Sequence, residues 1–148
     1  MTEELLEKSY WVVDILPDQV PEDSPGRYFA VEAYYLQPFR MAVIHRRFTD
    51  ILLKLNCYYD FRISTPDGDT DVLNPDPDLL DAWINEEQKD LCILFPGEDA
   101  LITLNHDDIY MTVYHPPEAL LERIGRLASA EGMFLRRPER SQEMKDRG

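Results

Sequence analysis

The sequence predicts an α+β fold, in which a mainly antiparallel sheet of about five to six strands carries two longer helices and one or two short ones on one face. Three observations favour this fold. The chain has 148 residues, of which 44% are apolar and 11% aromatic, enough for the core of one domain. Short alternating apolar runs are typical of strands. Segments of helical periodicity interrupt them without regular strand–helix–strand repeats, which favours α+β over α/β.

Residues 1–135 are expected to form this single globular domain. Residues 136–148 lack an apolar pattern and carry charges of both signs, which predicts a disordered C-terminal tail. At the other end, Thr2–Lys8 is expected to form a short helix with Thr2 as its cap.

The first half of the chain predicts one strand, one ambiguous segment and one long helix. Tyr10–Leu16 is rich in aromatic and β-branched residues and stops at Pro17, which is typical of a strand. Tyr28–Leu36 alternates like a strand, although its Ala and Glu residues leave a helix open. Pro38 begins the clearest helix, because apolar residues recur on one face of it: Ile44, Phe48, Ile51, Leu52 and Leu55. His45, on the opposite face, is expected to be solvated.

The middle of the chain predicts a strand over Cys57–Ile63, a long loop over Thr65–Pro77, and a short helix from there to about Glu87. Strand-like runs at short spacing then predict an antiparallel meander: Leu91–Phe95, Ala100–Leu104 and Ile109–Tyr114.

A last helix follows the meander. Pro116-Pro117 begins it, and Gly132 is a favourable C-terminal stop. Residues 133–135 are expected to add a short edge strand.

Charge is the strongest indication of partners. Fifteen basic side chains face twenty-nine acidic ones, a net charge of −14. Such a field repels nucleic acid and anionic membranes and attracts basic surfaces. No apolar run approaches the ~20 residues that span a bilayer, and the N-terminus lacks the pattern of a signal peptide. We therefore expect a cytoplasmic protein that binds a basic protein and contacts neither nucleic acid nor membrane directly; the sequence sets no oligomeric state.

Two groups of residues suggest metal or acid–base chemistry. Asp67-Gly68-Asp69-Thr70-Asp71 spaces carboxylates like a calcium loop, but it lacks the glycine and glutamate positions of an EF-hand and favours a solvated turn. His106-Asp107-Asp108 and His115 lie at a predicted sheet end, without the spacing that places two imidazoles on one face. We expect no cofactor, no metal and no catalytic residue.

The hypothesis that follows is a non-enzymatic protein-binding module, comparable to an immunity protein that neutralises a toxin with a cationic cleft. Its contacts are expected to combine acidic residues with outward-facing tyrosines: Asp67, Asp69, Asp71, Asp76, Tyr34 and Tyr58. The alternative is a small metal-dependent hydrolase or ligand-binding enzyme with its chemistry in sheet-end loops: Asp67, Asp69, His106 and Asp108.

Overall fold

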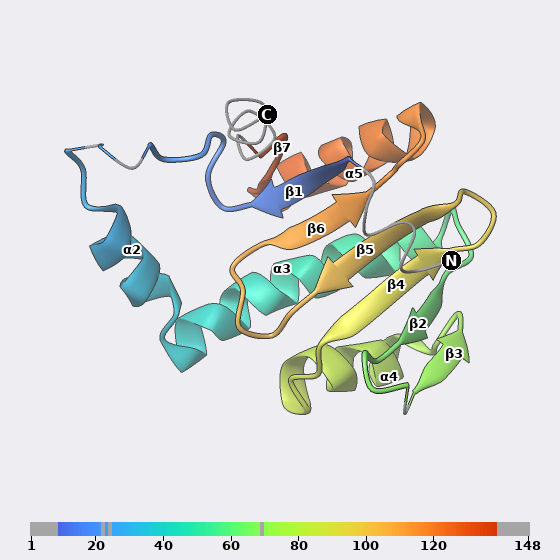
Figure 1. Ribbon diagram of the computed structural model, residues 1–148. Helices are drawn as coiled ribbons and strands as arrows, with labels where there is room; N and C mark the ends of the chain where they lie inside the picture. Colours follow the sequence, from blue (N-terminus) through green and yellow to red (C-terminus); the bar gives the residue numbers. More distant parts are fainter. Residues whose placement is uncertain (1–8, 22, 24, 69, 139–148) are drawn as a thin grey trace.

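In the described part of the chain, seven strands form one antiparallel sheet in the order β3-β2-β4-β5-β6-β1-β7 (Figure 1). The computed structural model describes residues 9–21, 23, 25–68 and 70–138. The strands are β1 (Tyr10–Asp14), β2 (Arg62–Ser64), β3 (Asp71–Leu73), β4 (Leu91–Phe95), β5 (Ala100–Leu104), β6 (Met111–Tyr114) and β7 (Phe134–Arg136). The predicted α+β class and antiparallel sheet are confirmed, with more strands than the expected five to six. The additional strand, β3, lies inside the segment expected to be a loop.

The longer helices α3 and α5 and the short α4–η1 segment lie against one face of the sheet (Figure 1). The helices are α2 (Tyr28–Tyr35), α3 (Pro38–Asn56), α4 (Pro77–Asp81), the π-helix η1 (Ala82–Glu86) and α5 (Glu118–Ala130). Helix α2 differs from the others, because it stands beside the sheet and buries none of its residues. The expectation that all helices cover one face therefore does not hold for α2.

The core fills the space between α3 and the helix-facing side of the sheet. Every residue of the predicted apolar stripe of α3 is buried: Ile44, Phe48, Ile51, Leu52 and Leu55. Opposite them, Ile93 of β4 stands between Ile63 and Ile102 of the neighbouring strands, and all three are buried. Burying one such side chain stabilises the fold by ~1.5–3 kcal/mol, so this layer is its main source of stability.

The segment expected to be strand or helix, Tyr28–Leu36, forms helix α2 over Tyr28–Tyr35. Its apparent alternation has no structural counterpart, because neither set of alternating side chains is buried. Local contacts set the helix instead: the Tyr28 hydroxyl donates to Glu32 Oε2 at 3.0 Å, four residues on, and Leu36 N–H donates to the Glu32 carbonyl at 2.9 Å.

The strand predicted over Cys57–Ile63 was placed too early, since β2 begins at Arg62. Residues 57–59 continue the last turn of α3, and Tyr59 N–H donates to the Leu55 carbonyl. The amide of Phe61 then donates to the side chain of Asn74 at 3.0 Å, and Asn74 N–H returns a bond to the Phe61 carbonyl at 2.8 Å. Asn74 thus closes the open end of the β2–β3 hairpin. This hairpin is why the prediction of a loop over Thr65–Pro77 was wrong for β3.

Helix α5 ends as predicted at Gly132, which has φ +76°. Met133 N–H donates to the Ala128 carbonyl and Gly132 N–H to the Ser129 carbonyl, the pair of bonds of a Schellman motif. The chain then forms β7, which extends one residue beyond the expected domain end, to Arg136. The helix expected over Thr2–Lys8 and most of the expected tail lie outside the described residues.

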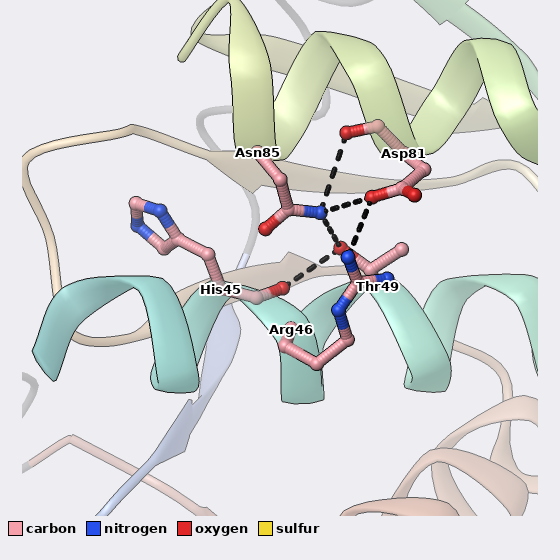
Figure 2. A network of polar contacts seen from close by, with 5 residues as sticks. All are labelled: His45, Arg46, Thr49, Asp81 and Asn85. Carbon is pink, nitrogen blue, oxygen red and sulfur yellow. Dashed lines mark hydrogen bonds and ion pairs between the residues drawn. The ribbon is translucent and has the colours of Figure 1, made fainter. Parts of the chain in front are cut away.

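A polar network joins α3 to the α4–η1 segment (Figure 2). Asn85 Nδ2 donates to Asp81 Oδ1 at 2.6 Å and to Thr49 Oγ1 at 3.0 Å, while Arg46 pairs with Asp81 at 2.9 Å. Thr49 Oγ1 donates in turn to the His45 carbonyl at 2.8 Å. This side of α3 is thus covered by another element, which is why the sequence pattern of one apolar face underestimates the packing of the helix.

We expect Asn85→Ala to lower the free energy of unfolding by about 1–3 kcal/mol, because Thr49 and Asp81 lose a shared donor in a partly buried site. Glu86→Ala, the exposed neighbour in the same π-helix, should change it by less than about 0.5 kcal/mol. Urea denaturation of the two variants checks this. Equal effects would show that the network does not stabilise the packing of η1 on α3.

Candidate binding site

A cavity of about 640 Å³ lies on the sheet face opposite to α3. Its floor consists of the alternate residues of β1 and β6 that point away from the core: Tyr10, Val12, Asp14, Thr112 and Tyr114. Their neighbours Val13, Met111 and Val113 are buried in the core on the other side. Strand alternation therefore gives these two strands one apolar face and one face of aromatic and polar groups.

The walls of the cavity come from two loops and from α2. The loop after β1 contributes Asp18, and α2 contributes Tyr28, Phe29 and Glu32. The turn between β5 and β6 contributes polar and aromatic residues: Asn105, Asp108 and Tyr110. Segments distant in the sequence thus meet around one concave site.

An ion pair between Asp14 and Arg136 lies in this cavity, with 2.7 Å between Asp14 Oδ2 and Arg136 Nη2. The two side chains are only 9% and 16% exposed. Ile15 N–H also donates to Asp14 Oδ1 at 2.7 Å, which leaves this carboxylate well satisfied. In contrast, Arg136 Nε and Nη1 are buried and have no hydrogen-bond partner among the described residues. The guanidinium therefore holds two donors that no described acceptor uses and that neighbouring protein atoms cover.

The cavity has an excess of negative charge and of tyrosine. Among the described residues that line it, there are four carboxylates (Asp14, Asp18, Glu32 and Asp108) and one cation, Arg136, a net charge of −4 + 1 = −3. Burial, the hydrogen bond to Glu32 and the charges of Glu32 and Asp14 raise the pKa of Tyr28 to about 12. Burial and then the charge of Asp108 raise the pKa of Tyr110. These surroundings favour a cation.

A histidine and its carboxylate partners stand beside this site in the β5–β6 turn. His106 Nδ1 lies 2.8 Å from Asp90 Oδ1, which also accepts the His106 backbone N–H at 2.9 Å, and His106 Nε2 lies 3.0 Å from Asp107 Oδ1. The hydrogen bond to Asp90 raises the pKa of His106. Both ring nitrogens are engaged, so the geometry closes a turn and offers no open ligand position.

The second surface of interest covers α2 and the start of α3, and we call it the α2 surface. Six large apolar residues are exposed on it: Phe29, Val31, Tyr34, Leu36, Phe39 and Val43. Phe29 and Phe39 are 80% and 67% exposed. The guanidinium of Arg40 lies 3.8 Å from the ring centroid of Tyr34 and 4.4 Å from that of Phe39, which holds this part of the surface in one arrangement. Phe29 belongs both to this surface and to the cavity.

The structure does not gather the contact residues proposed from the sequence on one surface. Asp67 and Asp71 lie on the β2–β3 hairpin, where Asp67 accepts from the Thr65 hydroxyl and Asp71 pairs with Arg62 at 3.1 Å. Asp76 precedes α4, and Asp69 lies outside the described residues.

The two tyrosines proposed as contacts are separated as well. The Tyr58 ring has Arg123 above it at 4.0 Å and lines a second, smaller hollow with Arg62 and Leu73. Tyr34 is on α2, far across the sheet from β3 (Figure 1). Of the proposed contacts, Tyr34 alone belongs to the α2 surface.

The residues of the alternative enzyme site are likewise divided between two turns. Asp67 follows β2 and His106 and Asp108 follow β5, with β4 between these strands. Within the described ranges, no group of three or more His, Cys, Asp or Glu residues is arranged to hold a metal ion. Nothing in this geometry favours the hydrolase.

Sequence reasoning missed the residues that make the cavity. Arg136 was assigned to the tail, although it pairs with a residue 122 positions earlier. Asp14, a charge between Val13 and Ile15 in a predicted strand, was an available signal, since a charge at such a position is rarely buried without a partner.

No protein-family model, curated protein or solved structure matches this chain. None of its described helices has the length and apolar character needed to cross a membrane.

His45 lies behind the β5–β6 turn and is 5% exposed, so the expectation of a solvated residue was wrong. Burial, and then the charge of His106, lower its pKa below 6.5, and its Nε2 has no partner in the described part of the chain. The long helix α3 is covered on more than one side, which its single apolar stripe does not reveal.

We expect this histidine to make the fold acid-sensitive. As the pH falls below about 6.5, the unfolded chain takes up a proton that folded His45 resists, so the free energy of unfolding decreases, by at most about 1.4 kcal/mol per pH unit for one proton. In His45→Met this loss should be absent, and urea denaturation at pH 7.5 and 5.5 measures it. In His106→Gln the loss of stability on acidification should be larger than in wild type, because the raised pKa of His106 contributes stability that is full at low pH and lost as the pH rises, and the variant lacks this contribution. Parallel pH profiles for wild type and His45→Met would contradict the assignment.

Proposed function

We propose that this protein is a non-enzymatic binding module that engages the basic surface of a partner protein through the α2 surface and the acidic cavity beside it. The observation that carries the proposal is the exposure of α2. Its eight residues bury no side chain, although most of them are apolar or aromatic.

A helix of this kind gains little stability from the rest of the fold. Isolated helices shorter than ~12–15 residues are marginal in water, and most helices in proteins are held by an apolar face packed on a core. Here Phe29, Val31 and Tyr34 are exposed, and Tyr35 alone among the side chains of α2 packs against the core, where it is partly buried. Large apolar side chains left exposed on one helix of a folded domain favour an interaction site there, and burial by a partner would stabilise both the helix and the complex.

The composition of the α2 surface is that of an interface centre. Tyrosine, phenylalanine and arginine are enriched at protein contacts, and a stacked arginine loses little freedom on binding. Arg40 is already stacked on Tyr34 and Phe39. These three side chains are thus already in contact in the free protein.

Charge supports a basic partner. The net charge of −14 steers cationic proteins toward the chain, and the cavity next to Phe29 concentrates carboxylates where such a protein would dock. A second copy of the chain would bring two strongly acidic molecules together, which opposes self-association. An immunity protein that covers the cationic cleft of a toxin is a concrete example of this chemistry.

Photocrosslinking from position 39 identifies the partner. With a benzophenone amino acid in place of Phe39, we expect crosslinks in cells to one protein whose contact surface is rich in Lys and Arg. Crosslinks between two copies of this chain, or to an acidic protein, would contradict the proposal.

Calorimetry with the purified partner then tests the surface. We expect the double variant Phe29→Ser, Phe39→Ser to weaken binding by about a hundredfold or more, as loss of central aromatic contacts does, and binding to weaken with salt. The matched control is Tyr58→Ser, Leu73→Ser, which removes two exposed apolar side chains elsewhere and should change affinity less than about threefold. Both double variants should unfold at the wild-type temperature. Equal effects of the two variants on affinity would overturn the assignment of the site.

A further inference from the structure

We infer that the cavity receives a single arginine or lysine residue of the partner. The cationic head of this residue lies among the carboxylates, and its backbone carbonyl oxygen accepts a hydrogen bond from Arg136. This inference rests on the proposed function and names the chemistry that its cavity recognises.

The lining selects a cation. Tyr10, Tyr28, Tyr110 and Tyr114 present aromatic groups around an excess of carboxylates, and the rings of Tyr10 and Tyr114 stand 5.4 Å apart on the floor. Ring faces and carboxylates both attract ammonium and guanidinium groups, and the attraction grows as water is excluded. A free anion would meet four like charges in the same space.

Arg136 provides hydrogen-bond donors for a second contact, to a carbonyl oxygen. Asp14 uses one end of its guanidinium, while the buried Nε and Nη1 have no acceptor among the described residues. Buried donors in proteins are almost always satisfied, so an acceptor from outside the described residues is expected here, reached once the covering side chains shift. Because Asp14 already neutralises Arg136, a neutral peptide carbonyl suits these donors and does not add to the negative charge.

The size of the cavity agrees with this occupant. About 640 Å³ lies within the range of roughly 300–1,000 Å³ for small-ligand sites. It is wide enough for a long side chain together with the backbone that carries it. Phe29, shared by the cavity and the α2 surface, connects the two contacts.

Three small probes test the inference on the full chain: Nα-acetyl-arginine amide, its neutral isostere Nα-acetyl-citrulline amide, and Nα-acetyl-glutamate amide. Titration followed by ¹H–¹⁵N correlation spectra at pH 7.5 should show saturable binding of the arginine probe, with a Kd of about 1 mM and shifts at Thr112 and Asn105. The citrulline probe should bind at least about tenfold more weakly than the arginine probe, because it lacks the positive charge. The glutamate probe should not bind.

Two substitutions in one turn give a matched comparison. Asp108 lines the cavity, whereas its neighbour Asp107 is 84% exposed at the side chain and does not. We expect Asp108→Asn to weaken binding of the arginine probe about tenfold while leaving the citrulline probe unchanged, and Asp107→Asn to leave both unchanged. Equal affinity for arginine and citrulline, preference for glutamate, or shifts confined to other surfaces would each overturn the inference.

The outcome is separable from that of the proposed function. Phe39 is not part of the cavity lining, so Phe39→Ser should leave the affinity for the arginine probe unchanged. The same variant should bind the partner protein more weakly. If the partner requires the α2 surface but the arginine probe does not bind, the cavity inference fails and the proposed function stands. If the arginine probe binds as expected but substitutions on the α2 surface do not change the affinity for the partner, the cavity chemistry is supported and the proposed docking surface is wrong.

Discussion

The position of β1 between β6 and β7 is the constraint on which the candidate site depends. Strand β1 pairs with β6 through Tyr10–Val13 and with β7 through Val12–Asp14, so the first and last described strands become neighbours. Because β7 pairs there, Arg136 arrives next to Asp14 on the face opposite to the core. Without this pairing the Asp14 carboxylate would be buried with no cation beside it, which costs several kcal/mol in a protein interior.

This arrangement also explains why charge remains in a site that could have been apolar. A buried ion pair is weak evidence for stability, since well-packed apolar side chains often do as well. Arg136 keeps two buried nitrogens without a partner in the described part of the chain, an arrangement that further reduces any gain in stability. In the proposed function, Arg136 and the exposed aromatic rings of α2 beside the cavity both belong to the recognition surface.

The sequence predicted those parts of the fold whose signals are local and periodic. The apolar stripe of α3, the meander of β4, β5 and β6, and the glycine stop of α5 are each encoded within a few residues, and each is confirmed. The β2–β3 hairpin was missed because side-chain hydrogen bonds of Asn74 close it. Such bonds leave no alternating apolar pattern in the sequence. Helix α2 was left ambiguous, since a segment that buries neither face carries no periodic signal.

The candidate site was less accessible to sequence reasoning. Counting aspartates located the acidic β2–β3 hairpin, where Asp71 is paired with Arg62, but not the four carboxylates that share one cavity from separate parts of the chain. Such a constellation depends on strand order, and strand order is set by long-range pairing that composition and spacing do not contain. Negative charge beside aromatic rings occurs in the cavity next to α2. It also occurs in the smaller hollow beside the hairpin, where Asp60 and Glu98 accompany Tyr58 and Tyr59.

Hydrogen exchange of the backbone amides, compared with and without the basic partner, distinguishes these two places most directly. We expect the amides of Val31–Leu36 to exchange rapidly in the free protein, because α2 has no buried side chain, and to be protected at least about tenfold in the complex. The amides of the β2–β3 hairpin should not change. Protection of the hairpin with unchanged exchange in α2 would contradict this binding site.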